Sequence, residues 1–587
     1  MIADTTIVWR CGMLRRIFSY MHQYKIYAVL AVFCVAAESI FELIVPVIMA
    51  DLIDVGVAGR DRQYIYAKGI QMGVCAILAL ILGVGSARFS ALAGQGLGAE
   101  LRKAEYERLQ AYSFSNIDHF RVSSIVTRLT SDVTNIQNSV STGLRPFCRG
   151  PVMLVSATVV AFTMNARLAL VFLVALPTLA VLLFLIVKNV RPLYSKMQNA
   201  IDLVNRIIQE NLTAIRVVKA YVRGDYETAK FEEVNLNLKS QSEKAFRLAA
   251  LNMPAMQIVM YGTILGLIWF GGRMIQNGEM QVGELTGFLS YVMQILNSLM
   301  MISNVFLMMT RSMASGSRIL EIIDEKIDIT DQDAKDLEVK KGSIEFDHVS
   351  FKYKKDAEEE VLTDITLNIP AGSTFGIVGQ TGSAKTTLVQ LIPRLYDVTK
   401  GEIRIDGIPV KNYPLEHLRD AIAVVLQKNT LFSGSLIDNL RWGKEDASME
   451  EIREACRISC ADEFIDRLSD GYDTEMGQGG VNVSGGQKQR LCIARAILKE
   501  PKVLILDDST SAVDTATEAK IREMLASRLP DMTKIIIAQR ISSVRYADQI
   551  LILDDGKIAD IGTHEELLRR SPIYQEIYES QKEGAQL

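Results

Sequence analysis

A glycine-rich segment past the middle of the chain has the residue types and spacing of a phosphate-binding loop. Gly379-Gln380-Thr381-Gly382-Ser383-Ala384-Lys385-Thr386-Thr387 follows the apolar run 375–378. The N–H groups of such a loop, and of the helix it opens, point at phosphate oxygens. We expect Lys385 to neutralise phosphate charge and the Thr386 hydroxyl to meet Mg²⁺. The strict pattern has glycine where this chain has Ala384. Because alanine suits a helix start, we expect binding to survive.

Two acidic residues close a second apolar run, Leu504-Ile505-Leu506, in the sequence. Asp507 lies where a strand would end, and we expect it to hold Mg²⁺ through water. Asp508 follows directly. Further polar motifs precede and follow this pair, namely Tyr353, Gln427, Ser484-Gly485-Gly486-Gln487, Ser511-Ala512-Val513-Asp514 and Gln539. To position these residues, a strand must precede the glycine loop and another must precede the acidic pair. A helix must follow the glycine loop, and another must begin at Ser484.

In this order the motifs resemble those of ATP-binding cassette (ABC) exporters, and the resemblance covers nearly the whole chain. It implies that Tyr353 stacks on adenine, the alternative being an aromatic of the core at a strand end. It also implies that Gln427 reaches Mg²⁺ and the attacking water, so that Thr386, Gln427 and Asp507 form the metal set. Residues 484–487 match the family's signature, and residues 511–514 match its D-loop.

Two positions depart from the family pattern together. Asp508 stands where an active ATPase of this family has glutamate, so its carboxylate is one methylene short of the place needed to orient water. Gln539 stands in place of the switch histidine, and an amide cannot carry the charge of an imidazole. Two cassettes of this family pair head to tail, so that each ATP lies between one P-loop and the other subunit's signature. The resemblance therefore implies a degenerate site on this chain and an intact signature for a partner's site.

The first half of the chain has the composition of a membrane domain. At 587 residues the chain is too long for one domain, and its net charge of −4 gives no sign of nucleic-acid binding. Runs of about 20 apolar residues can cross a bilayer. Six such segments lie near 25–50, 67–93, 143–165, 168–188, 249–271 and 282–308. The sequence thus predicts a membrane domain over 1–325, a linker over 326–341 and a nucleotide-binding domain over 342–587.

The two long connections, about 94–142 and 189–248, are polar, basic and helical in pattern. The positive-inside bias places them in the cytoplasm, together with both termini and the nucleotide-binding domain. We expect membrane helices that extend into the cytoplasm and turn at short transverse pieces near Ser115–Phe120 and Tyr221–Thr228. In the exporter family such pieces are coupling helices that dock on the ATPase domains; plain cytosolic loops are the alternative.

Two carboxylates inside the first apolar segment need a polar environment. Glu38 and Glu42 are four residues apart and share one helix face. A carboxylate is costly inside a membrane and should face a cavity or a polar partner. Recognition of a cationic substrate or a proton, and a polar contact between helices, remain equal alternatives. The seven scattered cysteines include no CxxC pair, which argues against a disulfide framework or structural zinc.

The predicted architecture is a polytopic α-helical membrane domain, with six transmembrane helices and long cytoplasmic extensions, fused to an α/β P-loop ABC nucleotide-binding domain. The resemblance implies a plasma-membrane or inner-membrane exporter that uses ATP and Mg²⁺. It would pair with a second half-transporter, most simply a different one, and move amphipathic compounds, lipids or peptides outward. A slow homodimeric exporter and an ATP-gated regulatory or sensory membrane protein are the alternatives.

Overall fold

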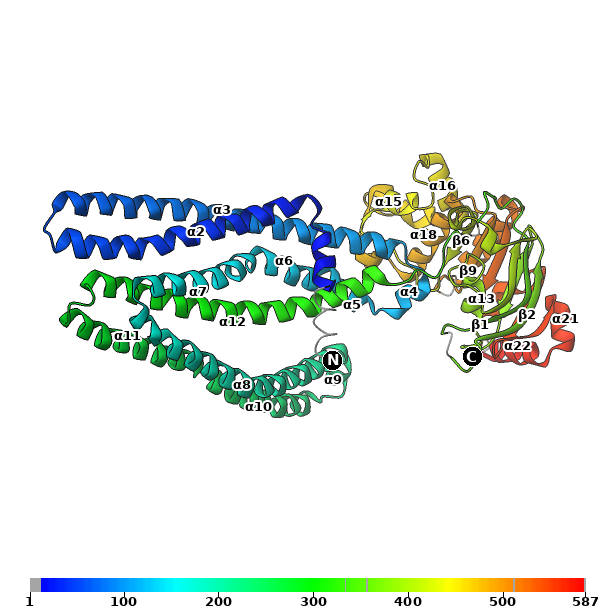
Figure 1. Ribbon diagram of the computed structural model, residues 1–587. Helices are drawn as coiled ribbons and strands as arrows, with labels where there is room; N and C mark the ends of the chain where they lie inside the picture. Colours follow the sequence, from blue (N-terminus) through cyan, green and yellow to red (C-terminus); the bar gives the residue numbers. More distant parts are fainter. Residues whose placement is uncertain (1–11, 333, 355–356, 510–511, 585–587) are drawn as a thin grey trace. The chain divides into compact units, whose positions relative to one another are not determined.

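The computed structural model describes residues 12–332, 334–354, 357–509 and 512–584, and the chain divides into two compact units (Figure 1). One unit takes in the chain up to Arg108 together with Ser123–Asp324. The other takes in Leu109–Val122 together with the chain from Glu325 onward. The stretch 109–122 therefore packs with the second unit, although it lies within the first half of the sequence.

In the part of the chain that the structure describes, six helices of the first unit are long and apolar enough to cross a membrane, which agrees with the predicted number. Phe172, Phe288 and Tyr291 are buried where these helices pack together. Many other apolar side chains, such as Phe33 and Val174, are exposed on the helix surfaces, as expected for contact with lipid. The helices that carry the spans are α2 (Lys25–Asp51), α3 (Arg62–Gln110), α7 (Leu144–Met164), α8 (Ala166–Thr213), α11 (Asn252–Gln276) and α12 (Val282–Asp324).

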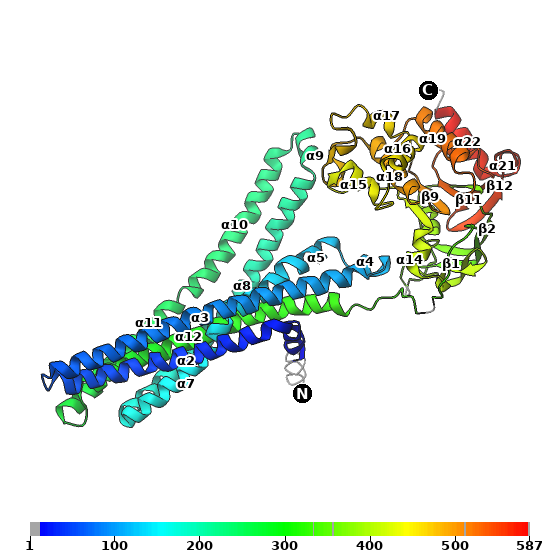
Figure 2. The same cartoon turned by 90° about the horizontal axis from the view of Figure 1, so that it is seen from above.

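The long connections are helical extensions, and Figure 2 shows α8 and α10 (Gly224–Ala249) running side by side. Short helices lie where α3 and α8 end, namely α4 (Phe114–His119) and α9 (Ile215–Ala220). The first coincides with the predicted transverse piece, but the prediction of the second at 221–228 is wrong. Val222 has a left-handed backbone (φ 54°), which ends the helical run after α9. Helix α10 begins two residues later, with acidic residues in its first turn.

Helix α4 belongs to the second unit through specific contacts. Ser113 caps its N-terminus in a capping box with Asn116. The Asn116 amide donates to the Lys326 carbonyl at 3.0 Å, and the Tyr396 hydroxyl donates to the Asp118 carboxylate at 2.7 Å. Short helices α5 (Val122–Thr127) and α6 (Val133–Ser141) then return the chain to the first unit.

The second unit is built on two sheets. An antiparallel sheet has the order β2-β1-β4-β5, with strands Leu362–Ile369, Ile344–Phe351, Lys400–Ile405 and Ile408–Pro409. The second sheet has the order β12-β11-β3-β10-β9-β6, with strands Lys557–Gly562, Gln549–Asp554, Thr374–Val378, Thr533–Ile537, Val503–Asp507 and Ile422–Val425. Neighbouring strands of this second sheet run parallel, except for the antiparallel pair of β11 and β12. Strands β3, β9 and β10 are almost wholly buried, which explains their continuous apolar runs.

Helices cover these sheets and carry the remaining motifs. Those that matter for the site are α13 (Lys385–Gln390), α18 (Gly485–Leu498), α19 (Thr515–Arg528) and α20 (Ile541–Val544). The others are α14 (Leu415–Asp420), α15 (Leu436–Arg441), α16 (Met449–Ile458), α17 (Asp462–Ile465), α21 (His564–Arg570) and α22 (Pro572–Gly584). A small ribbon pairs β7 (Gly434–Ser435) with β8 (Glu475–Met476).

Candidate functional site

Three neighbouring strands end level with one another and bring the predicted chemistry to one edge of the sheet. Ile537 of β10 pairs with Ile377 of β3 on one side and with Asp507 of β9 on the other. The loops that follow these strands therefore start side by side. Ligands of open parallel sheets bind at such carboxyl ends. The glycine loop follows β3, Gln539 follows β10, and the acidic pair spans the end of β9, with Asp507 as its last residue and Asp508 just beyond it.

The glycine loop has the backbone that phosphate binding requires. A side chain at Gly379 would lie 2.1 Å from the Leu553 carbonyl oxygen, and Gly382 has a φ of +92°. Ala384 is the N-cap of α13 and has a left-handed backbone, with φ 70° and ψ 22°. Our reason for tolerating alanine here, that it suits a helix start, is therefore wrong. The left-handed region penalises every residue with a Cβ, so Ala384 carries backbone strain that glycine would avoid.

Lys385, Thr386 and Asp507 lie together beneath this loop. The Lys385 ammonium donates to the carbonyls of Gly379 at 2.9 Å and Gln380 at 2.7 Å. The Thr386 hydroxyl donates to the Asp507 carboxylate at 3.1 Å. Burial lowers the pKa of Lys385 and raises the pKa of Asp507. A hydroxyl beside a carboxylate supplies two of the oxygen ligands that Mg²⁺ prefers.

Asp508 is the point at which both departures from the family pattern meet. The Gln539 amide donates to Asp508 Oδ2 at 3.0 Å, and the Gln427 amide donates to the same oxygen at 3.3 Å. Burial raises the pKa of Asp508, although these two hydrogen bonds and the charges of Lys385 and Arg540 oppose the rise. The structure thus brings to Asp508 one side chain from 81 residues earlier and one from 31 residues later in the sequence.

Tyr353 lies on the other sheet, just past β1, with 44% of its surface exposed. Its ring meets Phe351 and Tyr396 edge to face, with centroids 4.9 Å and 5.2 Å apart. Its hydroxyl lies 2.9 Å from the hydroxyl of Thr387 in the loop helix. The ring is therefore tied to the glycine loop and still offers surface to a ligand.

The signature opens a different helix from the glycine loop. Ser484 caps α18 through a capping box with Gln487, while Gly485 and Gly486 form the first turn. A side chain at Gly486 would lie 2.7 Å from the Ala512 carbonyl oxygen, which explains the glycine. Ser511 of the predicted D-loop lies outside the described residues, whereas Asp514 caps α19 by accepting the Thr517 N–H. Ser484 and Gly485 are exposed and available to a second molecule.

Comparisons with known proteins agree with this geometry. Residues 28–299 match the ABC transporter transmembrane region, and residues 362–511 match the ABC transporter domain. An uncharacterized ABC transporter ATP-binding protein, YfiB of Bacillus subtilis, is 38% identical over 575 residues, which cover 98% of this chain and 100% of the relative. The chain belongs to the ABC transporter family. Its membrane domain and ATP-binding domain make it an ATP-driven exporter half-transporter, and a half-transporter requires a dimer partner.

Two further similarities place this transporter among exporters. The ATP-dependent lipid A-core flippase of Desulfotalea psychrophila is 34% identical over 489 residues, which cover 83% of this chain and 85% of the flippase. The structure of a bacterial Atm1-family ABC exporter with ATP bound has a TM-score of 0.78 and is 26% identical, with 95% of this chain and 99% of that chain covered. The transporter is thus a multi-pass membrane protein whose cassette binds ATP.

Sequence reasoning missed the partners of the intramembrane carboxylates. In the transporter, Arg145 of α7 donates to Glu38 at 2.5 Å, and Arg149 donates to Glu38 at 3.1 Å and also to Glu42. A polar contact between α2 and α7 therefore exists. The sequence held one signal, the matching spacing of two arginines and two glutamates four residues apart, but this spacing alone does not show that the two segments pack together.

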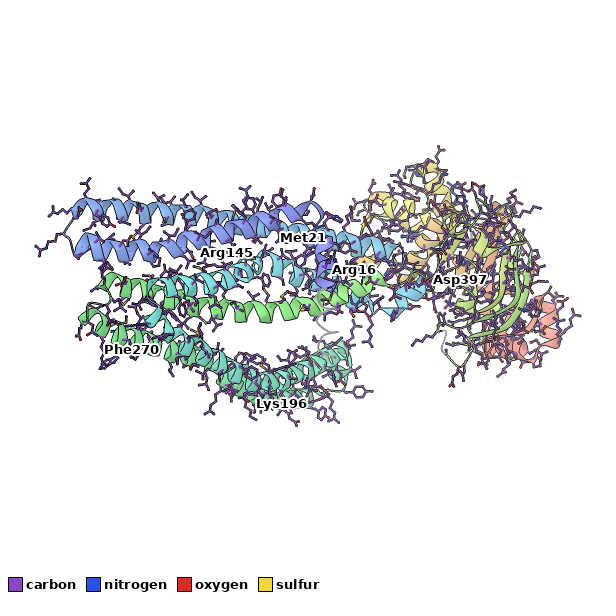
Figure 3. The ribbon with its side chains drawn as sticks, viewed as in Figure 1. Arg16, Met21, Arg145, Lys196, Phe270 and Asp397 are labelled. Atoms are coloured by element: carbon purple, nitrogen blue, oxygen red, sulfur yellow. The ribbon has the colours of Figure 1, made fainter. Side chains whose placement is uncertain are left out.

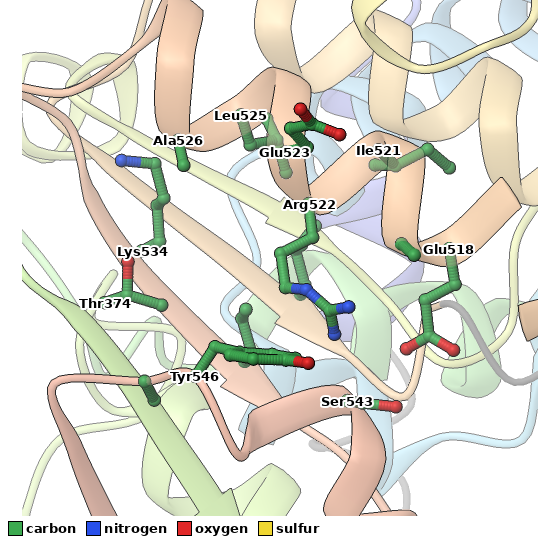
Figure 4. A pocket seen from close by; sticks show the side chains of 14 residues that line it. Thr374, Glu518, Ile521, Arg522, Glu523, Leu525, Ala526, Lys534, Ser543 and Tyr546 are labelled. Atoms are coloured by element: carbon green, nitrogen blue, oxygen red, sulfur yellow. The ribbon is translucent and has the colours of Figure 1, made fainter. Parts of the chain in front are cut away.

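The transporter's cassette also has a hollow that contains none of the predicted nucleotide contacts. This pocket of about 350 Å³ lies between α19, β10 and the segment after α20 (Figure 4). Arg522 lies over the ring of Tyr546, with its guanidinium carbon 4.7 Å from the ring centroid. Its lining is mainly apolar.

Proposed function

We propose that this chain is the degenerate half of a heterodimeric ABC exporter. Its own ATP site hydrolyses slowly, and its signature completes a competent site on a different half-transporter. The observation that carries the proposal is the contact of Gln427 and Gln539 with one oxygen of Asp508. The three side chains that family members use to position water and sense phosphate are engaged with one another.

The chemistry of Asp508 supports slow hydrolysis. A general base works within about 2.6–3.2 Å of the proton that it abstracts, and contributes roughly 10²- to 10⁴-fold to the rate. The aspartate side chain is one methylene shorter than glutamate, and its Oδ2 already accepts two amide protons. Gln539 donates a hydrogen bond but brings no positive charge toward a phosphate. Each of these features weakens the step that follows nucleotide binding.

The groups that bind nucleotide are nevertheless present. The glycine-loop N–H groups and Lys385 would hold phosphates, Thr386 and Asp507 would hold Mg²⁺, and Tyr353 would stack on adenine. Mg²⁺, when bound, would neutralise phosphate charge and polarise the reacting phosphoryl group. We infer a site that retains ATP for many cycles of the partner's site. We also propose that the cassette and both termini lie in the cytoplasm, because the long connections are basic.

The substrate proposed is an amphipathic compound, a class to which lipids and some peptides belong. Its support is the similarity to a protein named for flipping lipid A-core, together with a membrane unit that contains a charged cavity. Export outward agrees with the similarity to a bacterial Atm1-family exporter.

The test compares the ATPase activity of the native complex after a substitution in the signature and after one in the glycine loop. A tag on this chain, expressed in its native cells, retrieves the chain with its partner. Ser484→Arg is expected to abolish most ATPase activity, because it blocks the helix start that would face the partner's ATP. Lys385→Ala is expected to spare most hydrolysis, because it affects the slow site.

Mass spectrometry of the same preparation identifies the partner subunit. Two equal copies of this chain, or equal loss of ATPase activity from both substitutions, would contradict the heterodimer and favour a slow homodimeric exporter. Full ATPase activity without movement of any amphiphile would favour the sensory alternative. Glu445→Gln, on the exposed surface of the cassette, is the control for general damage.

A further inference from the structure

The charged cluster inside the membrane unit lines a cavity of about 740 Å³. The cavity has contributions from four helices: Glu38 and Glu42 come from α2, Arg145 and Arg149 from α7, and Gln294 from α12. Helix α3 forms the remaining wall. Figure 3 labels Arg145 on α7, near the start of that helix. Such a cluster is expensive inside a membrane and points to a function.

Two buried acceptors in the cavity have no donor among the described residues. Glu38 is 3% exposed, and although its Oε1 accepts from both arginines, its Oε2 accepts no hydrogen bond. The Oε1 of Gln294 is also buried without a partner. A buried acceptor without a donor is unfavourable, so a ligand that donates to these oxygens gains affinity on binding.

Some N–H donors of the charged cluster remain available to bind a ligand. The Arg145 side chain is 38% exposed and donates to Glu38 through Nη2, so that its other N–H groups can reach an anionic group. Two arginines and two glutamates balance to a formal charge of zero. A ligand with no net charge therefore enters without leaving an uncompensated charge in the membrane.

The wall that α3 forms beside the charges is apolar, and small residues line much of it. Ala76, Ala79, Gly83 and Ala87 lie three or four residues apart on α3, with Leu80 and Val84 beside them. A side chain at Gly83 would lie 3.0 Å from Glu38 Oε1, so any larger residue would crowd the charges. This wall provides a path for a hydrocarbon chain next to a polar headgroup.

We propose that this cavity binds an amphiphile whose headgroup carries both a phosphate and a primary ammonium group. The ammonium donates to Glu38 and Gln294, the phosphate accepts from Arg145, and the chain lies along α3. The inference rests on the proposed export function for its cargo role, and it narrows the cargo to zwitterionic lipids with N–H donors.

The test measures lipid binding by the purified transporter complex in detergent, using native mass spectrometry. The probes are phosphatidylethanolamine, phosphatidylcholine and phosphatidylglycerol with identical acyl chains. The choline headgroup has the same charges but no N–H donor, and the glycerol headgroup has a net negative charge. We expect phosphatidylethanolamine to bind about tenfold more tightly than either, the ratio that one lost charge-assisted hydrogen bond produces. Equal binding of the ethanolamine and choline lipids overturns the proposal.

Gln294→Leu separates ligand binding from a structural role. It replaces the unsatisfied amide with an apolar group of similar size, so the melting temperature without added lipid should stay equal or rise. The preference for ethanolamine over choline should fall about tenfold at the same time. Arg167→Gln, at the exposed pair with Glu279, is the matched control and should change neither measurement. Loss of stability with an unchanged lipid preference would show a purely structural role.

Phosphoethanolamine without acyl chains distinguishes a soluble zwitterion from a lipid. It should not compete with phosphatidylethanolamine at equal concentration, because it makes no contact along α3. Competition at equal concentration would overturn the assignment to an amphiphile. ATPase activity of the same complex is measured in parallel. Absent lipid preference in a complex with full ATPase activity refutes this inference alone, whereas lost ATPase asymmetry refutes the proposed function.

Discussion

Replacing Ala384 with glycine should stabilise the ATP-binding domain, although alanine is usually the more stable choice at the start of a helix. Ala384 has φ 70° and ψ 22°. A left-handed backbone costs an L-residue roughly 1–2 kcal/mol. Glycine avoids this cost but loses about 0.4–1 kcal/mol through the greater freedom of the unfolded chain. The difference predicts a net gain of about 0.5–1 kcal/mol for Ala384→Gly.

The assay is thermal unfolding of the full-length protein in detergent, without nucleotide and then with ATP and EDTA. A gain of this size corresponds to a melting temperature about 1–4 °C higher for a domain of this length. Because the loop is left-handed before ligand binds, the ATP affinity should change by less than about threefold.

Ala526→Gly is the matched control, since Ala526 is exposed in the last turn of α19. There glycine should lower stability, by at most about 1 kcal/mol, so the two substitutions have opposite signs. A lower melting temperature for Ala384→Gly would refute the reasoning, because it would mean that residue 384 has an ordinary helical backbone.

Three further outcomes are expected. Asp508→Glu with Gln539→His should raise ATP turnover at this chain's own site about 100-fold. The ATPase activity is measured in a complex in which the P-loop lysine of the partner subunit is replaced, so that only this chain's site can hydrolyse ATP; no increase would contradict the degenerate site. Tyr396→Phe removes the hydrogen bond to Asp118, and should weaken the response of ATPase activity to transported amphiphiles; an unchanged response would contradict coupling through α4. Burial alone would raise the pKa of Asp406, but four backbone N–H groups outweigh burial and lower it. Asp406→Asn should therefore lower the free energy of unfolding by about 2 kcal/mol at pH 7. The difference in unfolding free energy between parent and variant should shrink below about pH 4, because the parent carboxylate is then protonated; a difference that does not change with pH would contradict this.

Much of the cassette could be predicted from the sequence because its strands are short, apolar and bounded by motifs. The apolar run 375–378, predicted as the strand before the glycine loop, matches β3, and the predicted helix after Ser484 matches α18. The number of membrane helices also followed from composition alone, since a span needs a continuous apolar run. These features are local, and each is visible within about 20 residues.

The errors concern backbone conformation and distant contacts. Nothing in the motif 379–387 says that residue 384 is left-handed, and the break at Val222 depends on a single positive φ. The arginine partners of Glu38 lie 107 and 111 residues away, so a window on the first apolar segment could not contain them. In both cases the deciding information is three-dimensional.

The Asp508 cluster shows why two substitutions are more informative than one. Aspartate alone would leave a histidine free to contact phosphate, and glutamine alone would leave a glutamate free to orient water. Together they form an internal contact, in which Gln539 donates to Asp508 at 3.0 Å and Gln427 adds a second hydrogen bond. Hydrogen bonds to a charged group are worth roughly 1.5–3 kcal/mol each, so releasing the carboxylate for catalysis is costly. The signature at Ser484 shows no comparable change, as the proposed function requires of a motif that acts on another subunit's nucleotide. This contrast supports the proposed asymmetric pair, in which one site holds ATP and the other turns it over.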